Sequence, residues 1–170
     1  MFLIDQKEGC SFEFSKLISM MEYTRYTTIE EVKDLSVEEL DFLYDENANS
    51  IGMLLAHIAA GEKAYQLVTF ENRKLTDEVI QSLNPGLLLG KQGQEQIREN
   101  SIDYYLKELS DVRSRTIEMF KTLPDEWLFE QTPFVQGKPA NNLFKWFHVF
   151  EDELNHRGQI RLIKKMVRRK

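Results

Sequence analysis

The sequence predicts an all-α protein, a four-helix bundle whose long helices are joined by crossover connections. Two observations lead to this prediction. Four segments of the 170-residue chain carry apolar residues at the three- and four-residue spacings of an amphipathic helix. The segments between them are long and hold prolines and glycines, which favours crossovers over short hairpins.

Length and composition describe one ordinary domain over residues 1–170, large enough to form a core without disulfide bonds. The hydrophobic content of 42% and the charged content of 29% are typical of a soluble globular protein. The net charge of −6 argues against nucleic-acid binding, and no apolar run reaches the roughly 20 residues of a membrane span. The N-terminus lacks a signal-peptide pattern, so we expect a cytoplasmic protein.

The first half of the chain predicts two of the long helices. The first begins near Ser11, and its apolar face is formed by Phe14, Leu17, Ile18 and Met21. A cap-like sequence after Ser36 predicts a short helical turn within the connection. The second long helix is expected to begin at Asn49 or Ser50, and it carries His57 in its middle.

The third long helix follows an irregular polar segment that begins after Phe70 and contains a turn at residues 84–86. Ser101 is a good N-cap for this helix, and Pro124 ends it.

Residues 125–140 should form a long connection before the fourth helix, which Asn141 or Asn142 caps and which runs to the C-terminus. Within the connection a short strand, or a segment packed under the bundle, is expected at Phe129, Thr132, Phe134 and Val135.

The last helix carries the residues with the most distinctive chemistry. Its expected inward stripe is Leu143, Phe147, Phe150 and Leu154. Beside that stripe lie His148, Asp152, His156 and Gln159. Side chains four residues apart share a helix face, so Asp152 could bind one cation either with His156 or with His148. The two histidines lie about 12 Å apart along the axis and cannot easily share a metal.

A further ligand must come from another helix, and His57 lies on the face of its helix that should turn inward. Bundle cores build metal sites in this way, from side chains on facing helices. Two imidazoles and one carboxylate suit zinc or nickel, with iron and manganese as further candidates. Such a set leaves coordination positions open, as in a catalytic site.

Other candidate residues have less support. Glu62, Glu151 and Glu153 could be ligands. Glu151 and Glu153 are rotated about 100° to either side of Asp152, so a solvated position, or one beside the ligands, is the simpler interpretation for these two. Gly158 is costly inside a helix, and a close helix crossing would explain it. Cys10 has no neighbour that marks it as a nucleophile, so we expect it to be inert.

At the histidines the chain resembles a known family. The segments 49–62 and 151–159, the second of which contains His-Arg-Gly-Gln, are similar to the DinB/YfiT-like metalloprotein superfamily. The resemblance covers nearly the whole chain and implies an up-down-down-up bundle, a homodimer and a bound divalent metal. By that match the ligands would be His57, Asp152 and His156. His148 and Gln159 would then be groups beside the ligands.

One position departs from the pattern of many relatives, because Asp152 stands where they have histidine. A carboxylate there is similar to the thiol-dependent members, which use glutamate. The resemblance therefore implies a metal-dependent enzyme that transfers a low-molecular-weight thiol such as bacillithiol, or that hydrolyses a small electrophile. The alternative is a non-catalytic metal-binding dimer that acts in a stress response.

Overall fold

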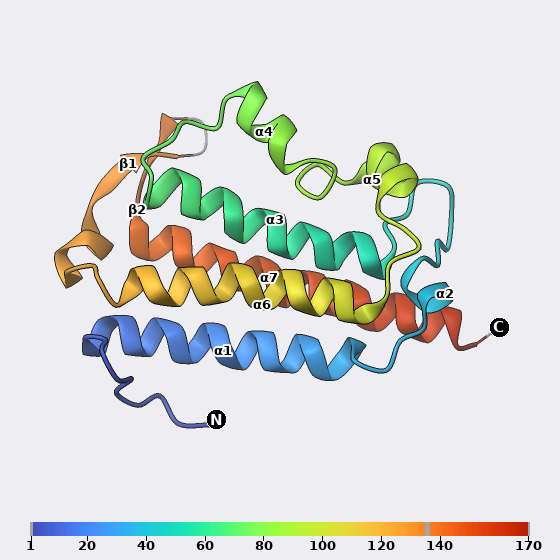
Figure 1. Ribbon diagram of the computed structural model, residues 1–170, viewed down its shortest axis with the longest axis horizontal. Coiled ribbons are helices and arrows are strands. Elements are labelled where there is room, and N and C mark those ends of the chain that lie inside the picture. Colours follow the sequence, from blue (N-terminus) through green and yellow to red (C-terminus); the bar gives the residue numbers. More distant parts are fainter. Residues whose placement is uncertain (1, 135–136, 170) are drawn as a thin grey trace.

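The computed structural model describes residues 2–134 and 137–169. Its four long helices lie side by side, which confirms the predicted all-α four-helix bundle (Figure 1). They are α1 (Phe12–Val32), α3 (Ile51–Thr69), α6 (Ile102–Phe120) and α7 (Asn142–Val167). Helix α3 packs against α6 and α7, and α1 packs against α7 and α6. No helix among the described residues is both long enough and apolar enough to cross a bilayer.

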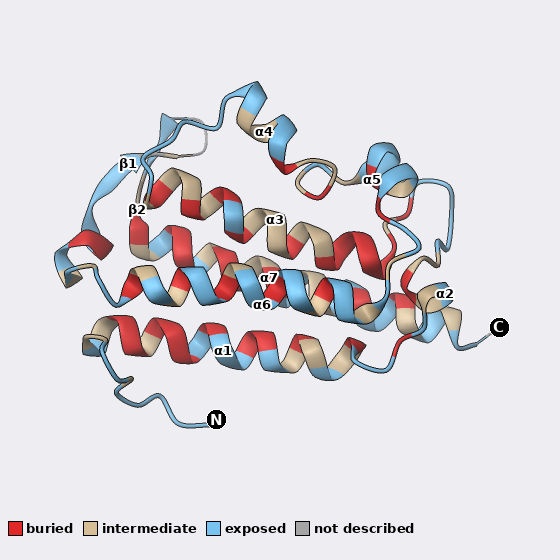
Figure 2. Ribbon diagram, viewed as in Figure 1, coloured by how far each residue is buried: buried red, intermediate tan, exposed pale blue. Residues whose placement is uncertain are grey.

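The direction of the helices explains the longest connection. Helices α3 and α6 run one way and α1 and α7 run the other, an up-down-down-up arrangement (Figure 1). Because α3 and α6 are parallel, residues 70–101 must return along the bundle, and they include α4 (Asp77–Leu83) and α5 (Gly90–Gln96). These two helices were not predicted, since seven residues are too few to show a helical period. This connection is mostly exposed or half-buried (Figure 2).

Each long helix begins after a predicted capping residue whose side chain accepts a backbone N–H three residues later. The caps are Ser11, Ser50, Ser101 and Asn141. The short turn α2 (Val37–Leu40) also appears as expected, with a complete capping box between Ser36 and Glu39. The polar cap residues therefore fixed where the helices start.

The connection between α6 and α7 forms a small hairpin at one end of the bundle (Figure 1). It consists of the 3-10 helix η1 (Asp125–Phe129), strand β1 (Gln131–Pro133) and strand β2 (Pro139–Asn141). The strands are antiparallel, with Thr132 opposite Ala140. The predicted strand is thus present at Thr132, while Phe129 ends η1 and Val135 lies outside the described residues.

The predicted inward stripe of α7 is wrong at two of its four positions. Phe150 is buried and Leu143 half-buried, but Phe147 is 44% exposed and Leu154 is 36% exposed. The first half of α7 is apolar nearly all round, so its periodicity does not select one face. Packing against α1 and α3 buries a neighbouring face instead, formed by Trp146, Val149, Phe150 and Glu153.

The interior of the bundle has two apolar clusters with a charged layer between them. One cluster lies toward the ends of the helices near α2 and the other toward η1. Between them each long helix contributes one buried charged side chain: Arg25, Glu62, Arg113 and Glu153. We call these four residues the charged layer. The solvated or peripheral place expected for Glu153 is wrong, because its side chain is buried, and Glu62, a possible metal ligand by sequence, is buried in ion pairs instead.

The charged layer is a closed set of ion pairs. Arg25 places Nε 2.9 Å from Oε1 of Glu153 and Nη2 3.1 Å from Oε2 of Glu62. Arg113 repeats the pattern, with Nε 2.8 Å from Oε1 of Glu62 and Nη2 3.3 Å from Oε2 of Glu153. The Thr116 hydroxyl adds a hydrogen bond of 2.7 Å to Glu62. Two cations and two anions cancel, so the charged layer carries no net charge.

The carboxyl group of Glu62 stays ionised because of its two arginine partners. Burial raises the pKa of this carboxyl, but the charges of Arg113 and Arg25 outweigh burial and hold it below the ordinary glutamate value. Its stabilising effect is therefore present at neutral pH and lost as the pH falls through this lowered pKa. Glu62→Gln leaves guanidinium charge uncompensated and should lower the free energy of unfolding by about 3–5 kcal/mol in urea titrations.

Asp111→Asn provides the matched control, because Asp111 forms an exposed ion pair with Lys107. This change should cost less than about 1 kcal/mol. Equal costs for the two variants would show that the charged layer does not hold the bundle together.

Candidate metal centre

His57 is oriented by the long connection that follows its helix. Its Nδ1 lies 3.1 Å from the backbone oxygen of Gly86. A carbonyl can only accept, so Nδ1 carries the proton and Nε2 keeps a free lone pair. The close approach requires glycine, because a Cβ at position 86 would lie 3.0 Å from the Ala56 oxygen and 3.1 Å from the Ala60 Cβ. The turn at residues 84–86 therefore fixes the imidazole.

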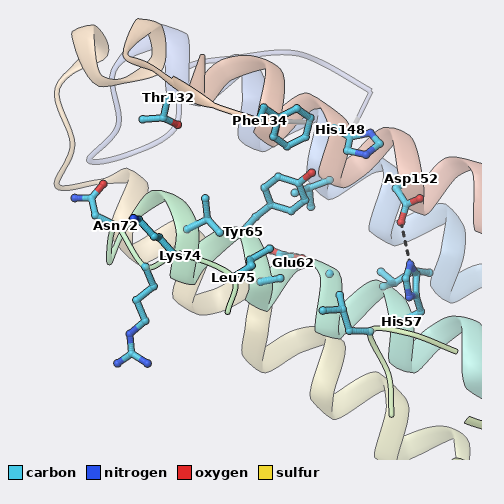
Figure 3. Close-up of a pocket in the computed structure, with 17 residues that line it drawn as sticks. His57, Glu62, Tyr65, Asn72, Lys74, Leu75, Thr132, Phe134, His148 and Asp152 are labelled. Carbon is cyan, nitrogen blue, oxygen red and sulfur yellow. Dashed lines mark ion pairs between the residues drawn. The ribbon is translucent and has the colours of Figure 1, made fainter. Parts of the chain in front are cut away.

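Helix α7 brings two further donors to the same place. Oδ2 of Asp152 lies 3.4 Å from Nε2 of His156 and 3.7 Å from Nε2 of His57. The two imidazole rings are 4.8 Å apart between centroids and nearly perpendicular, at 77°. Figure 3 shows Asp152 reaching from α7 toward His57 on α3. One donor atom from each of the three residues lies within 4.8 Å of the others.

The protonation states of this cluster suit a cation. Burial lowers the pKa of His57, and the nearby His156 lowers it further, so the ring is neutral at pH 7. Burial raises the pKa of Asp152, but a hydrogen bond and charge from His156 outweigh it and keep the pKa below the ordinary aspartate value. His57 thus presents a neutral nitrogen atom and Asp152 an ionised carboxylate, the forms of these groups that bind metals.

A divalent transition metal fits these residues. Within residues 2–134 and 137–169, Asp152 has no lysine or arginine partner, and no other three metal-ligating side chains converge in this way. Nδ1 of His156 is buried without a hydrogen-bond partner, and its side chain is only 12% exposed. Two imidazoles and a carboxylate are a donor set that zinc and nickel accept, with further ligand positions left open.

A cavity of about 850 Å³ opens beside the cluster. His57 and Asp152 form part of its wall, and the rest comes from α3, α7, the hairpin and the connection after α3 (Figure 3). Much of that wall is apolar, including Val68, Leu75 and Phe134. A small molecule can therefore reach His57 and Asp152 from a largely apolar space.

Two polar side chains face this cavity close to the cluster. Tyr65 projects into it from α3, with its ring 6.1 Å from that of His148 (Figure 3). Burial and the charge of Asp152 raise the pKa of Tyr65 to about 12, so the phenol stays protonated. The side chain of His148 is 42% exposed, and its Nδ1 lies 2.9 Å from Oε2 of Glu151.

Sequence reasoning from spacing left two pairs open on α7, and the structure directs one of them toward His57. Asp152 and His156 converge with it, whereas His148 lies on the cavity wall. Gln159 is exposed and forms no hydrogen bond among the described residues. The close crossing expected at Gly158 is wrong, because a Cβ there would meet no atom within 4 Å. The glycine faces solvent on this helix.

Two features of the site escaped sequence reasoning. The turn at residues 84–86 was expected, but nothing local indicates that its carbonyl meets a histidine 29 residues earlier. Tyr65 received no role in the site from the sequence. Its hydroxyl, about two turns beyond His57 on the same helix, was the available signal.

The bundle and its His/Asp/His cluster define a DinB-like helical protein, and the comparisons agree. A family model described as mycothiol-S-transferase matches residues 16–168, so the chain belongs to that family. A crystal structure of a Streptococcus pneumoniae protein from a structural-genomics programme has the same fold. Its TM-score is 0.62 and its identity 15%, over 99% of this chain and 94% of that one. No curated protein matches the sequence.

The cluster geometry predicts about one divalent ion per chain. His57→Ala and His156→Ala should each abolish this occupancy, because each removes one of only three donors. His148→Ala is the matched control and should keep the metal, since His148 pairs with Glu151 instead. Metal content is measured by mass spectrometry on dialysed protein. Full occupancy in a variant that lacks both His57 and His156 would rule these ligands out.

Proposed function

We propose that the protein is a divalent-metal-dependent enzyme that transfers a low-molecular-weight thiol to a small electrophile, with His57, Asp152 and His156 as the metal ligands. One observation carries the proposal: three donors converge with further ligand positions open, and two of them, His57 and Asp152, line a cavity of about 850 Å³. The mycothiol-S-transferase family supports the same class of reaction. Hydrolysis of a small electrophile, with water in place of the thiol, uses the same open position.

The side chains around the cavity suit this reaction. When bound, a divalent ion supplies a Lewis acid that lowers the pKa of a thiol or water beside it. The largely apolar wall excludes water from the attacking sulfur. Tyr65 remains protonated, so its hydroxyl can donate a hydrogen bond to the negative charge that develops on the electrophile. His148, on the same wall, can carry a proton between this region and solvent.

The non-catalytic alternative, a metal-binding stress-response dimer, is less well supported. A metal that served assembly alone would be expected in a closed site with all positions ligated. Here the donors leave positions open toward a cavity. That arrangement favours catalysis.

The thiol reaction is tested with the zinc- or nickel-loaded protein, a panel of mycothiol, bacillithiol, glutathione and cysteine, and chlorodinitrobenzene as electrophile. One thiol should give a saturable rate at least about tenfold above metal-free protein, since the metal shifts the thiol toward thiolate. His57→Ala should lose this rate, and His148→Ala should lower it while metal content is unchanged. Identical rates with and without metal for all four thiols would contradict the proposal.

We also propose a cytoplasmic homodimer. Low-molecular-weight thiols and a reduced cysteine belong to that compartment. Phe144, Phe147 and Leu154 form an exposed apolar stripe on α7, which is unusual for a monomer. A second copy of the chain would cover it.

Light scattering should therefore give about twice the chain mass of 20.1 kDa. Phe147→Glu should give the monomer mass, because it places a charge in the stripe. The control Leu162→Glu changes another exposed apolar position of α7 and should remain dimeric. A wild-type monomer at micromolar concentration would contradict the dimer.

A further inference from the structure

Lys145 is a buried cation near the cavity. It has 0% exposure and lies in the first turn of α7. Its ammonium donates a hydrogen bond to the hydroxyl of Thr132 on strand β1. Among residues 2–134 and 137–169 no carboxylate pairs with it. Buried lysines nearly always have a counter-charge, so this one calls for an explanation.

The surroundings of Lys145 increase the positive potential there. The N-terminal end of a long helix carries partial positive charge, and the first turn of α7 has no acidic residue to offset it. Burial lowers the pKa of Lys145, and no neighbouring charge opposes that change. The positive charge at this end of α7 is therefore uncompensated, and an anionic ligand could supply the missing negative charge.

Thr132 connects this cation to the cavity. It is exposed and forms part of the cavity wall, on the hairpin side (Figure 3). Its Oγ1 accepts from Lys145, so its own O–H remains to donate. Among the described residues no acceptor receives that proton. A hydroxyl polarised by an ammonium behind it is a strong donor to an anion.

We propose that Thr132, supported by Lys145, is an anion-recognition subsite of the cavity that binds a carboxylate of the thiol substrate. This inference rests on the proposed function and adds the substrate's chemical class. Lys145 precedes Asp152 by seven residues, which corresponds to about 10 Å along the helix axis. Because Thr132 contacts Lys145 at that end of α7, we expect a substrate that spans both places to be extended. The substrate is therefore an extended acidic thiol, of the size of a cysteine conjugate, and free cysteine is too short.

The test compares two thiols that differ only at the far end, mercaptooctanoate and mercaptooctanol. Their affinities for the zinc-loaded protein are measured by titration calorimetry under reducing conditions. Mercaptooctanoate should bind at least about tenfold more tightly, the effect of one charge-assisted hydrogen bond. Equal affinities in the wild type would overturn the subsite and leave the thiol reaction standing. If neither thiol binds, the proposed function fails as well.

Two variants test whether Thr132 and Lys145 cause the preference for mercaptooctanoate over mercaptooctanol. Thr132→Val keeps the shape of an exposed strand residue and removes the donor, and Lys145→Gln keeps a hydrogen bond to Thr132 and removes the charge. Each should reduce the preference to less than about twofold, with mercaptooctanol affinity unchanged. Calorimetry needs no turnover, so an effect on catalysis does not disturb this readout.

Lys74→Gln is the control, because Lys74 is a cation on the same cavity wall with no hydrogen bond to Thr132. It should keep the tenfold preference. If Lys74→Gln abolishes the preference, or Thr132→Val leaves it intact, the subsite lies elsewhere and the proposal is wrong. Thr132→Val and Lys74→Gln alter exposed or rim positions, so the test stands even if Lys145→Gln fails to fold.

Discussion

The ion pairs among Arg25, Glu62, Arg113 and Glu153 constrain the whole bundle. Each comes from a different long helix, and each guanidinium contacts both carboxylates, so a helix that rotates or slides loses its partners. Apolar packing alone tolerates small shifts of a helix. A buried charged side chain does not, because a shift that removes its partner leaves an uncompensated charge in the interior. Glu153 directly follows Asp152 in α7. The charged layer thus also sets how α7 faces α3, where the candidate metal centre lies.

Much of the fold could be predicted because its signals are local. The capping residues of all four long helices, and the proline after α6, Pro124, are recognised from a few neighbouring residues each. The helices α4 and α5 could not be predicted, since they are held by their place over the bundle more than by a sequence period. The buried face of α7 also depends on tertiary packing. Phe144 and Phe147 lie close to Trp146 in sequence, so the exposed and the buried face of this segment are similarly apolar.

The candidate site also has features that the sequence predicted and features that only the structure shows. Spacing within α7 limited the choice to two pairs around Asp152, and the inward face of the second long helix indicated His57. Only the family resemblance selected His156 over His148 before the structure was known. The structure supplies what spacing cannot, namely the carbonyl of Gly86 on His57 and the closing of the cavity by distant segments. The burial of Glu62 and Glu153 was missed for a further reason. Charged residues are usually at the surface, and their partners lie far away in sequence.

The cavity wall has a mixed origin, with the candidate ligands on rigid helices and much of the remaining wall on the hairpin and the connection after α3. Insertions and substitutions in such connections cost little stability, because the charged layer and both apolar clusters lie within the bundle. In the proposed enzyme, substrate preference can then change during evolution while the three candidate ligands stay in place. For an engineer, the hairpin and residues 70–101 are accordingly the segments to randomise when new thiols or electrophiles are wanted.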